Sequence, residues 1–192
     1  MRSFKRKYER GSGLGNYVKA IPGEKLSELE KGLFAVGAKY AFILRFGIET
    51  GLRVSDCLSM RVRSFSKRMN VFERKTGKYR EIEISERLFD FGLAYIAAHE
   101  LKPSDALFPT TIYRKWQPLT RQRVWGVFRK VADEIGLEEI GPHSMRKTYA
   151  MNVLRETGDI KAVQRALMHT NVDTTMRYLL DLRSFLELVK TS

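Results

Sequence analysis

The sequence has little of what several classes of protein require. Cys57 is the only cysteine, which excludes an intrachain disulfide framework and a cysteine-based zinc site and predicts a reducing, cytoplasmic environment. The most apolar stretch, residues 33–48, contains Lys39 and Arg45 and is too short and too charged to span a bilayer. The N-terminus is basic but leads into glycine-rich polar sequence, so it is not expected to be a secretory signal.

Acidic residues are also scarce relative to basic ones. The 192 residues include 22 Asp and Glu against 35 Lys and Arg, a formal net charge of +13. Because 43% of the residues are hydrophobic and 11% aromatic, the chain can bury a core, which excludes a disordered polycation. The excess of positive charge favours an anionic partner, a nucleic acid before a membrane surface.

Patterning along the chain predicts a mainly α protein with one small antiparallel β-sheet (α+β). Residues 1–22 combine basic side chains with glycines and predict a flexible arm or linker ahead of one domain over residues 23–192. Helical periodicity is expected from Glu24 to Gly51 and over 54–60, 86–99, 120–135, 142–156 and 160–168, with further helical stretches around Tyr178 and over 182–189. A period near two over 69–85, with Gly77 in the turn, predicts a β-hairpin.

One helix start has the composition of an anion site. His143 and Arg146 are three residues apart in the first turns after Pro142, where the helix geometry places them on one face. The free N–H groups and the dipole of that helix end favour a phosphate. His-x-x-Arg alone also occurs by chance on a solvated helix face.

Other residues could serve the same chemistry, although each also has an ordinary explanation. Arg53 and Asp56 have the spacing of a surface ion pair. His169 could be a capping or packing histidine, and Tyr178 could be a core residue. Lys75 and Lys78 flank the hairpin turn. Together they are the parts that metal-free phosphoryl transfer needs: arginines that clamp phosphate oxygens, histidines and a lysine that move protons, and a tyrosine nucleophile.

The order and spacing of these motifs resemble the tyrosine recombinase (phage integrase) family. The resemblance rests on five motifs and covers about residues 22–188, the catalytic domain of that family: TGLRVSD from Thr50 to Asp56, KTGK from Lys75 to Lys78, PHSMR from Pro142 to Arg146, LMH from Leu167 to His169, and Tyr178. It implies the tyrosine recombinase catalytic-domain fold.

The resemblance also implies a role for each residue. Arg53 and Arg146 would clamp the scissile phosphate, and Tyr178 would attack it to leave a 3′-phosphotyrosyl bond. Lys75, on the first strand of the hairpin, would protonate the departing 5′-oxygen; Lys78 is the alternative assignment. His143 would assist proton transfer, His169 would bind the phosphate, and Asp56 would orient Arg53. No metal, nucleotide or other cofactor is implied.

The implied partner is double-stranded DNA, with no role for a membrane. The candidate DNA contacts are Lys5, Arg6, Lys7, Lys67, Arg68, Lys78, Arg121 and Arg123. The resemblance further implies a tetramer on paired sites, joined through an apolar C-terminal tail over residues 181–192, and accessory DNA-bending proteins as additional partners.

Two departures from the family pattern leave alternatives open. Met168 stands where the family usually has glycine before the second histidine. No separate N-terminal core-binding domain is expected here, so the chain is either an isolated catalytic domain or a short single-domain member, like the fimbrial phase-variation recombinases. The alternative functions are a type IB topoisomerase-like DNA relaxase and a catalytically silent DNA-binding regulator of the same fold.

Overall fold

The computed structural model of the protein describes residues 18–168, and the structural statements below concern those residues. The elements follow in the order α1 (Gly23–Val36), α2 (Ala38–Thr50), α3 (Val54–Ser59), a 3₁₀ turn (Val62–Ser64), β1 (Arg68–Glu73), β2 (Lys78–Glu83), α4 (Glu86–Ala98), α5 (Arg121–Glu134), α6 (Pro142–Thr157) and α7 (Ile160–Ala166). The mainly α architecture with one small antiparallel sheet is therefore confirmed.

Two helices begin at side-chain caps that the sequence predicts. The Thr120 hydroxyl accepts a hydrogen bond from the backbone N–H of Arg123 at 3.2 Å and begins α5. The Asp159 carboxylate accepts from the N–H groups of Lys161 and Ala162 and begins α7. These contacts pair N–H groups that have no partner inside the helix, so the boundaries agree with the sequence pattern to within about two residues.

The two strands form a hairpin whose inward face carries Glu73 on β1 and Arg80, the partner of Val71, on β2. Phe72 lies opposite Tyr79, and Glu73 lies opposite Lys78. Along β1 the buried positions alternate and end on Glu73. Gly77 has φ +67° in the turn, the left-handed conformation that glycine adopts without steric cost.

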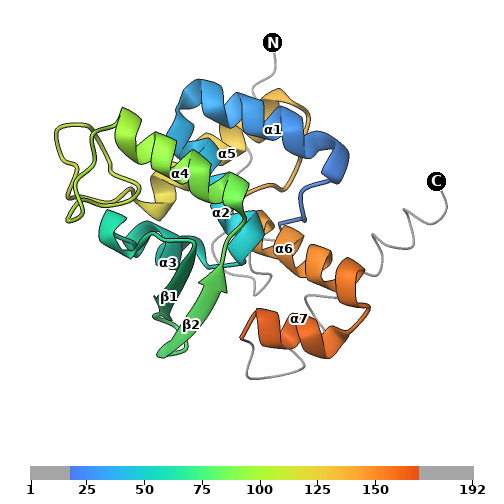
Figure 1. Ribbon diagram of the computed structural model, residues 1–192. Coiled ribbons are helices and arrows are strands. Elements are labelled where there is room, and N and C mark those ends of the chain that lie inside the picture. Colours follow the sequence, from blue (N-terminus) through green and yellow to red (C-terminus); the bar gives the residue numbers. More distant parts are fainter. Residues whose placement is uncertain (1–17, 169–192) are drawn as a thin grey trace, which may run out of the picture.

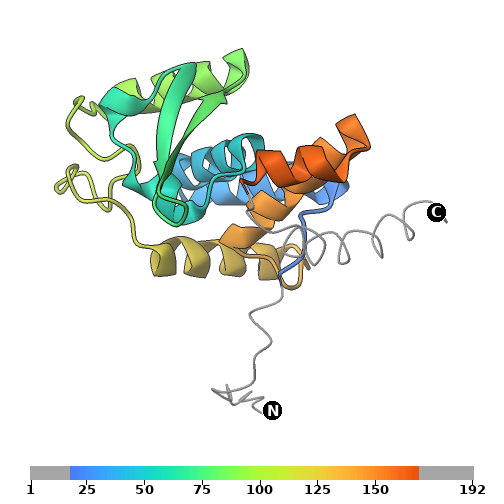
Figure 2. The ribbon, with the colours of Figure 1, turned by 90° about the horizontal axis from the view of Figure 1, so that it is seen from below.

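A large aromatic core holds α2 at the centre of the fold. The ring of Phe42 lies 5.1 Å from that of Phe108 and 5.6 Å from that of Phe65. A smaller core, which includes Met151 and Leu167, joins α6 to α7. In Figure 1 the hairpin and α7 extend downward from the helical layer, and Figure 2 shows the hairpin and α4 along one edge with α5 along the other.

Residues 18–22, the end of the predicted arm or linker, pack in part against the domain. Ala20 and Ile21 are buried, and the backbone N–H of Ile21 donates to the Thr148 hydroxyl on α6 at 2.9 Å. The apolar pair packs on the domain although glycine and charge dominate the sequence before it. Within residues 18–168, no helix is both long and apolar enough to cross a membrane.

Candidate active site

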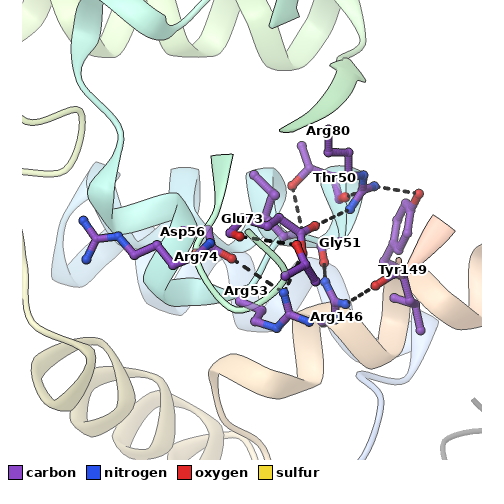
Figure 3. Close-up of polar contacts among 12 residues, drawn as sticks. Thr50, Gly51, Arg53, Asp56, Glu73, Arg74, Arg80, Arg146 and Tyr149 are labelled. Atoms are coloured by element: carbon purple, nitrogen blue, oxygen red, sulfur yellow. Dashed lines mark hydrogen bonds and ion pairs between the residues drawn. The ribbon is translucent and has the colours of Figure 1, made fainter. Parts of the chain in front are cut away.

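The candidate site is built around the turn between α2 and α3. Gly51 ends α2 with φ +63°, and Arg53 follows in extended conformation at the start of α3. Arginines from two other elements bind the carbonyls of this turn (Figure 3). Arg80 on β2 donates to the Thr50 carbonyl at 2.6 Å, and Arg146 on α6 donates to the Gly51 carbonyl at 2.5 Å.

Arg53 pairs with a carboxylate that the sequence motifs did not single out. Its Nη1 lies 2.5 Å from Oε2 of Glu73, which is fully buried, and 3.9 Å from Oδ2 of Asp56. Asp56, the carboxylate expected to orient Arg53, is therefore the more distant of the two acidic neighbours of Nη1. The side chain on the inward face of β1 reaches Arg53 at closer range than the one three residues along α3 does.

Asp56 is buried, so it does not form the ordinary surface ion pair that its spacing suggested. Its Oδ1 accepts a hydrogen bond from the backbone N–H of Arg74 at 3.4 Å. Burial is the main cause that raises the pKa of Asp56, and the charge of Glu73 raises it further, whereas the Arg74 N–H and Arg53 act in the opposite direction. Asp56 thus links α3 to the end of β1.

Arg146 is almost completely buried and joins three elements. From α6, its Nη1 binds the carbonyl of Gly51 and its Nη2 binds the carbonyl of Leu167 after α7, each at 2.5 Å. The first turn of α6 is closed by Ser144, whose hydroxyl accepts from the Gly141 N–H at 3.1 Å. The guanidinium therefore has a fixed place next to the turn that carries Arg53.

His143, the second residue of α6, lies in a field of positive charge. His143 is exposed, yet partial loss of water around its side chain is the main cause that lowers its pKa. The charges of Arg121, Arg146, Arg53 and Lys75 lower that pKa further. Basic side chains from α5, α6, the start of α3 and the hairpin turn thus act on the same imidazole, which favours its neutral form.

Lys75 is exposed and lies in the hairpin turn, so its predicted position on the first strand is wrong. Strand β1 ends at Glu73, because the Glu73 carbonyl accepts hydrogen bonds from the N–H groups of Thr76 at 3.2 Å and Gly77 at 2.9 Å. The turn still directs positive charge toward the site, since Lys75 is among the cations that lower the pKa of His143.

The predicted DNA contacts in the described part of the chain differ in their surroundings. Arg121 and Arg123 are exposed in the first turn of α5, and Lys78 is exposed at the start of β2. Lys67 pairs with Glu86, and Arg68 pairs with Glu83 at 3.3 Å, so acidic neighbours partly neutralise these two cations.

Several predicted residues lie outside the described range 18–168. They are Lys5, Arg6, Lys7, His169, Tyr178 and the tail over 181–192. Met168, the last described residue, has φ +50°. Glycine adopts this conformation without strain, which gives a physical reason for the glycine that the family usually carries there.

A group of side chains behind Arg53, formed by Glu73, Arg80 and Tyr149, was not predicted from the sequence. Arg80 Nη1 lies 3.6 Å from Glu73 Oε1, and Arg80 Nη2 donates to the Tyr149 hydroxyl at 3.1 Å (Figure 3). The alternation of β1 was the available signal, since it places Glu73 on the same face as the buried Val71. In the described chain no three His, Cys, Asp or Glu side chains come together as metal ligands would.

Comparison with known proteins shows the family to which the chain belongs. The model of the Phage integrase family matches residues 25–183. A probable integrase/recombinase, YoeC of Bacillus subtilis (strain 168), is 34% identical over 158 residues, which are 81% of this chain and 85% of YoeC. Tyrosine recombinase XerC of Roseiflexus castenholzii is 30% identical over 138 residues, 67% of this chain but only 43% of that protein.

Solved structures show the same fold at lower sequence identity. The XerH site-specific recombinase in its post-cleavage complex with palindromic difH superposes with a TM-score of 0.71 at 20% identity, covering 97% of this chain and 57% of that one. A lambda integrase dimer bound to a core site superposes with a TM-score of 0.67, covering 83% of this chain and 47% of that one. From its motifs, its fold and these relatives, the chain belongs to the phage integrase family, whose tyrosine recombinases cleave and rejoin DNA.

Proposed function

We propose that this chain is the catalytic domain of a site-specific recombinase or integrase that acts on double-stranded DNA. The observation that carries the proposal is that Arg146 binds the carbonyl of Gly51, next to the start of α3 where Arg53 lies, and is held by a second carbonyl at Leu167. The charges of Arg53, Arg146 and Lys75 also act together on His143, whose pKa they lower. Such a cluster of cations suits one phosphodiester with its developing negative charge. The single thiol, Cys57, is buried and suits work in a reducing cytoplasm.

In the proposed cleavage step, the Tyr178 phenol oxygen attacks the scissile phosphorus. A new phosphorus–oxygen bond forms to Tyr178, and the bond from phosphorus to the 5′-oxygen breaks. The phenol proton passes to His143, whose lowered pKa keeps it neutral and able to accept it. Lys75 gives a proton to the leaving 5′-oxygen, Arg53 and Arg146 hold the non-bridging oxygens, and His169 donates a hydrogen bond to the phosphate.

Strand joining reverses this chemistry with a 5′-hydroxyl from a partner duplex. One phosphodiester is exchanged for another through a covalent intermediate, so the free energy of the bond is retained and no nucleotide is needed. For the same reason the proposal assigns no cofactor.

We further propose that DNA lies over the first turn of α5 and the hairpin turn. Arg121 and Arg123 are exposed there, and Arg121 acts on the same imidazole as the clamp arginines. Replacing both arginines by alanine should weaken binding across all sequences and reduce its salt dependence. The same change at Lys67 and Arg68 should matter less, because acidic partners already neutralise them.

Assembly through the tail over residues 181–192 is a separate proposal. Its support is the apolar stripe of Leu182, Phe185, Leu186 and Val189 that follows Tyr178 in the sequence. We propose that this stripe docks on a neighbouring subunit in a tetramer on paired DNA sites. Deleting residues 182–192 should abolish assembly on paired sites, and unchanged assembly would refute the idea.

The decisive experiment is a covalent trapping assay. A nicked suicide DNA substrate should give a protein–DNA adduct with the native chain and none with Tyr178→Phe. Arg53→Ala and Arg146→Ala should lose cleavage by orders of magnitude and retain much of their DNA binding, because the clamp acts mainly in the transition state.

The same preparation separates the other activities of this fold. Plasmid relaxation without recombinant products would indicate a topoisomerase-like relaxase. DNA binding with no adduct under any condition would indicate a silent regulator and would refute the proposed function.

A further inference from the structure

Glu73 is the most deeply buried charged residue near the proposed clamp. Its side chain is fully buried at the end of β1, between two guanidinium groups (Figure 3). Oε2 lies 2.5 Å from Arg53, and Oε1 lies 3.6 Å from Arg80. An unpaired carboxylate would be very costly at this depth, so the two arginines and Glu73 stabilise one arrangement together.

The contact uses only one end of the Arg53 guanidinium. Both Glu73 and Asp56 approach Nη1 of Arg53. Within residues 18–168, Nε and Nη2 of Arg53 donate no hydrogen bond. Nε and Nη2 form the parallel pair of donors with which arginine grips a phosphate in two places. Glu73 thus holds the back of the guanidinium and leaves its phosphate-binding edge open.

The second partner of Glu73 is itself fixed to the fold. Arg80 donates to the Thr50 carbonyl at 2.6 Å and to the Tyr149 hydroxyl at 3.1 Å. Glu73 is therefore anchored through Arg80 to the end of α2 and to α6, the helix that carries Arg146. This chain of contacts connects the positions of the two clamp arginines.

We propose that Glu73 is a positioning residue for Arg53: its buried carboxylate orients the guanidinium so that the Nε–Nη2 edge faces the scissile phosphate. The inference rests on the proposed recombinase function and assigns Glu73 no contact with DNA. It also predicts that loss of the Glu73 carboxylate affects the cleavage rate and DNA binding differently. Loss of the carboxylate should slow chemistry, whereas binding of uncleaved DNA should hold or improve, because one negative charge near the phosphate is removed.

The test is Glu73→Gln, which keeps the size of the side chain and removes its charge. Single-turnover cleavage of the suicide substrate at saturating protein should fall about 10- to 100-fold, the range expected when an orienting partner is lost. Affinity for uncleaved DNA should not fall. Asp105→Asn is the matched control, since Asp105 is a buried carboxylate that bonds the N–H of Lys102 in the loop after α4. It should lose stability without slowing cleavage.

A second substrate distinguishes Arg53 from the Lys75 turn, which is closed on the Glu73 carbonyl. A bridging 5′-phosphorothiolate leaves as a thiolate and needs no proton from Lys75. If Glu73 acts through Arg53, the loss in Glu73→Gln persists on this substrate; if the loss disappears, Glu73 acts through Lys75 and the inference is wrong.

Unchanged cleavage by Glu73→Gln would also overturn the inference about Glu73. The proposed function would still be supported by the covalent adduct that the native chain forms. Absence of an adduct with the native chain would overturn both. Should Glu73→Gln fail to fold, Glu73→Asp keeps the charge but shortens the reach to Arg53, and it should show the same slower cleavage with retained binding. Native-like cleavage by Glu73→Asp would contradict the inference.

Discussion

Replacing Gly51 by alanine tests how tightly the turn at the centre of the site is packed. Gly51 has φ +63°, and a residue with a Cβ in the left-handed region loses about 1–2 kcal/mol. The added Cβ would also lie 2.1 Å from Cδ1 of Tyr149, so the ring or the turn must move, and that overpacking costs a further ~1–3 kcal/mol. We therefore expect Gly51→Ala to lower the free energy of unfolding by about 2–5 kcal/mol.

Gly77 offers a matched control in the same domain. Its φ is +67°, but no atom lies within 4 Å of the position that an alanine Cβ would take, so Gly77→Ala should show only the backbone cost of about 1–2 kcal/mol. Removing the obstructing ring gives the second control. In a Tyr149→Ala background, Gly51→Ala should also fall to about that backbone cost, because the steric overlap is gone.

Urea unfolding followed by circular dichroism gives the free energies of unfolding of the native chain and the four variants on one scale. The cleavage rate should fall with stability in Gly51→Ala, because the Gly51 carbonyl is a hydrogen-bond partner of Arg146. Equal losses at Gly51 and Gly77, or the same loss at Gly51 with and without the Tyr149 ring, would refute the packing argument.

Three further predictions address pH, backbone strain and salt. The pKa of His143 is lowered from 6.5 in the folded protein, so the unfolded chain binds more protons as the pH falls through and below that value. The free energy of unfolding should therefore drop on acidification, and His143→Gln should weaken the drop. Identical pH profiles of the two proteins in equilibrium unfolding would contradict this. Met168→Gly should change the free energy of unfolding by less than about 1 kcal/mol, since relief of the left-handed φ offsets the greater backbone freedom of glycine. Leu167→Ala at the neighbouring buried site should lower it by about 2–5 kcal/mol. Similar losses for the two variants in thermal unfolding would count against the strain argument. DNA binding should weaken steeply with salt as counterions are released, whereas cleavage of DNA that is already bound should respond much less, because Arg146 is enclosed; a parallel decline of both in single-turnover measurements would overturn that distinction.

Features that depend on neighbours along the chain could be predicted from the order of residue types. Thr120 and Asp159 begin their helices through hydrogen bonds that span two or three residues. The hairpin follows from a period of two around Gly77. The placement of His143 and Arg146 one turn apart on α6 is a matter of helical spacing. Periodicity and capping are local, so a pattern of residue types is sufficient to predict them.

Contacts between side chains that are far apart in the sequence could not be predicted in this way, because they depend on how the elements pack. Glu73 replaces Asp56 as the closest carboxylate to Arg53 because the end of β1 packs beside the start of α3. Residues 18–22 join the domain because Ile21 meets Thr148, 127 positions away. Each contact requires two elements to be brought together by burial of a shared core, and that free energy belongs to the whole fold and to no local segment.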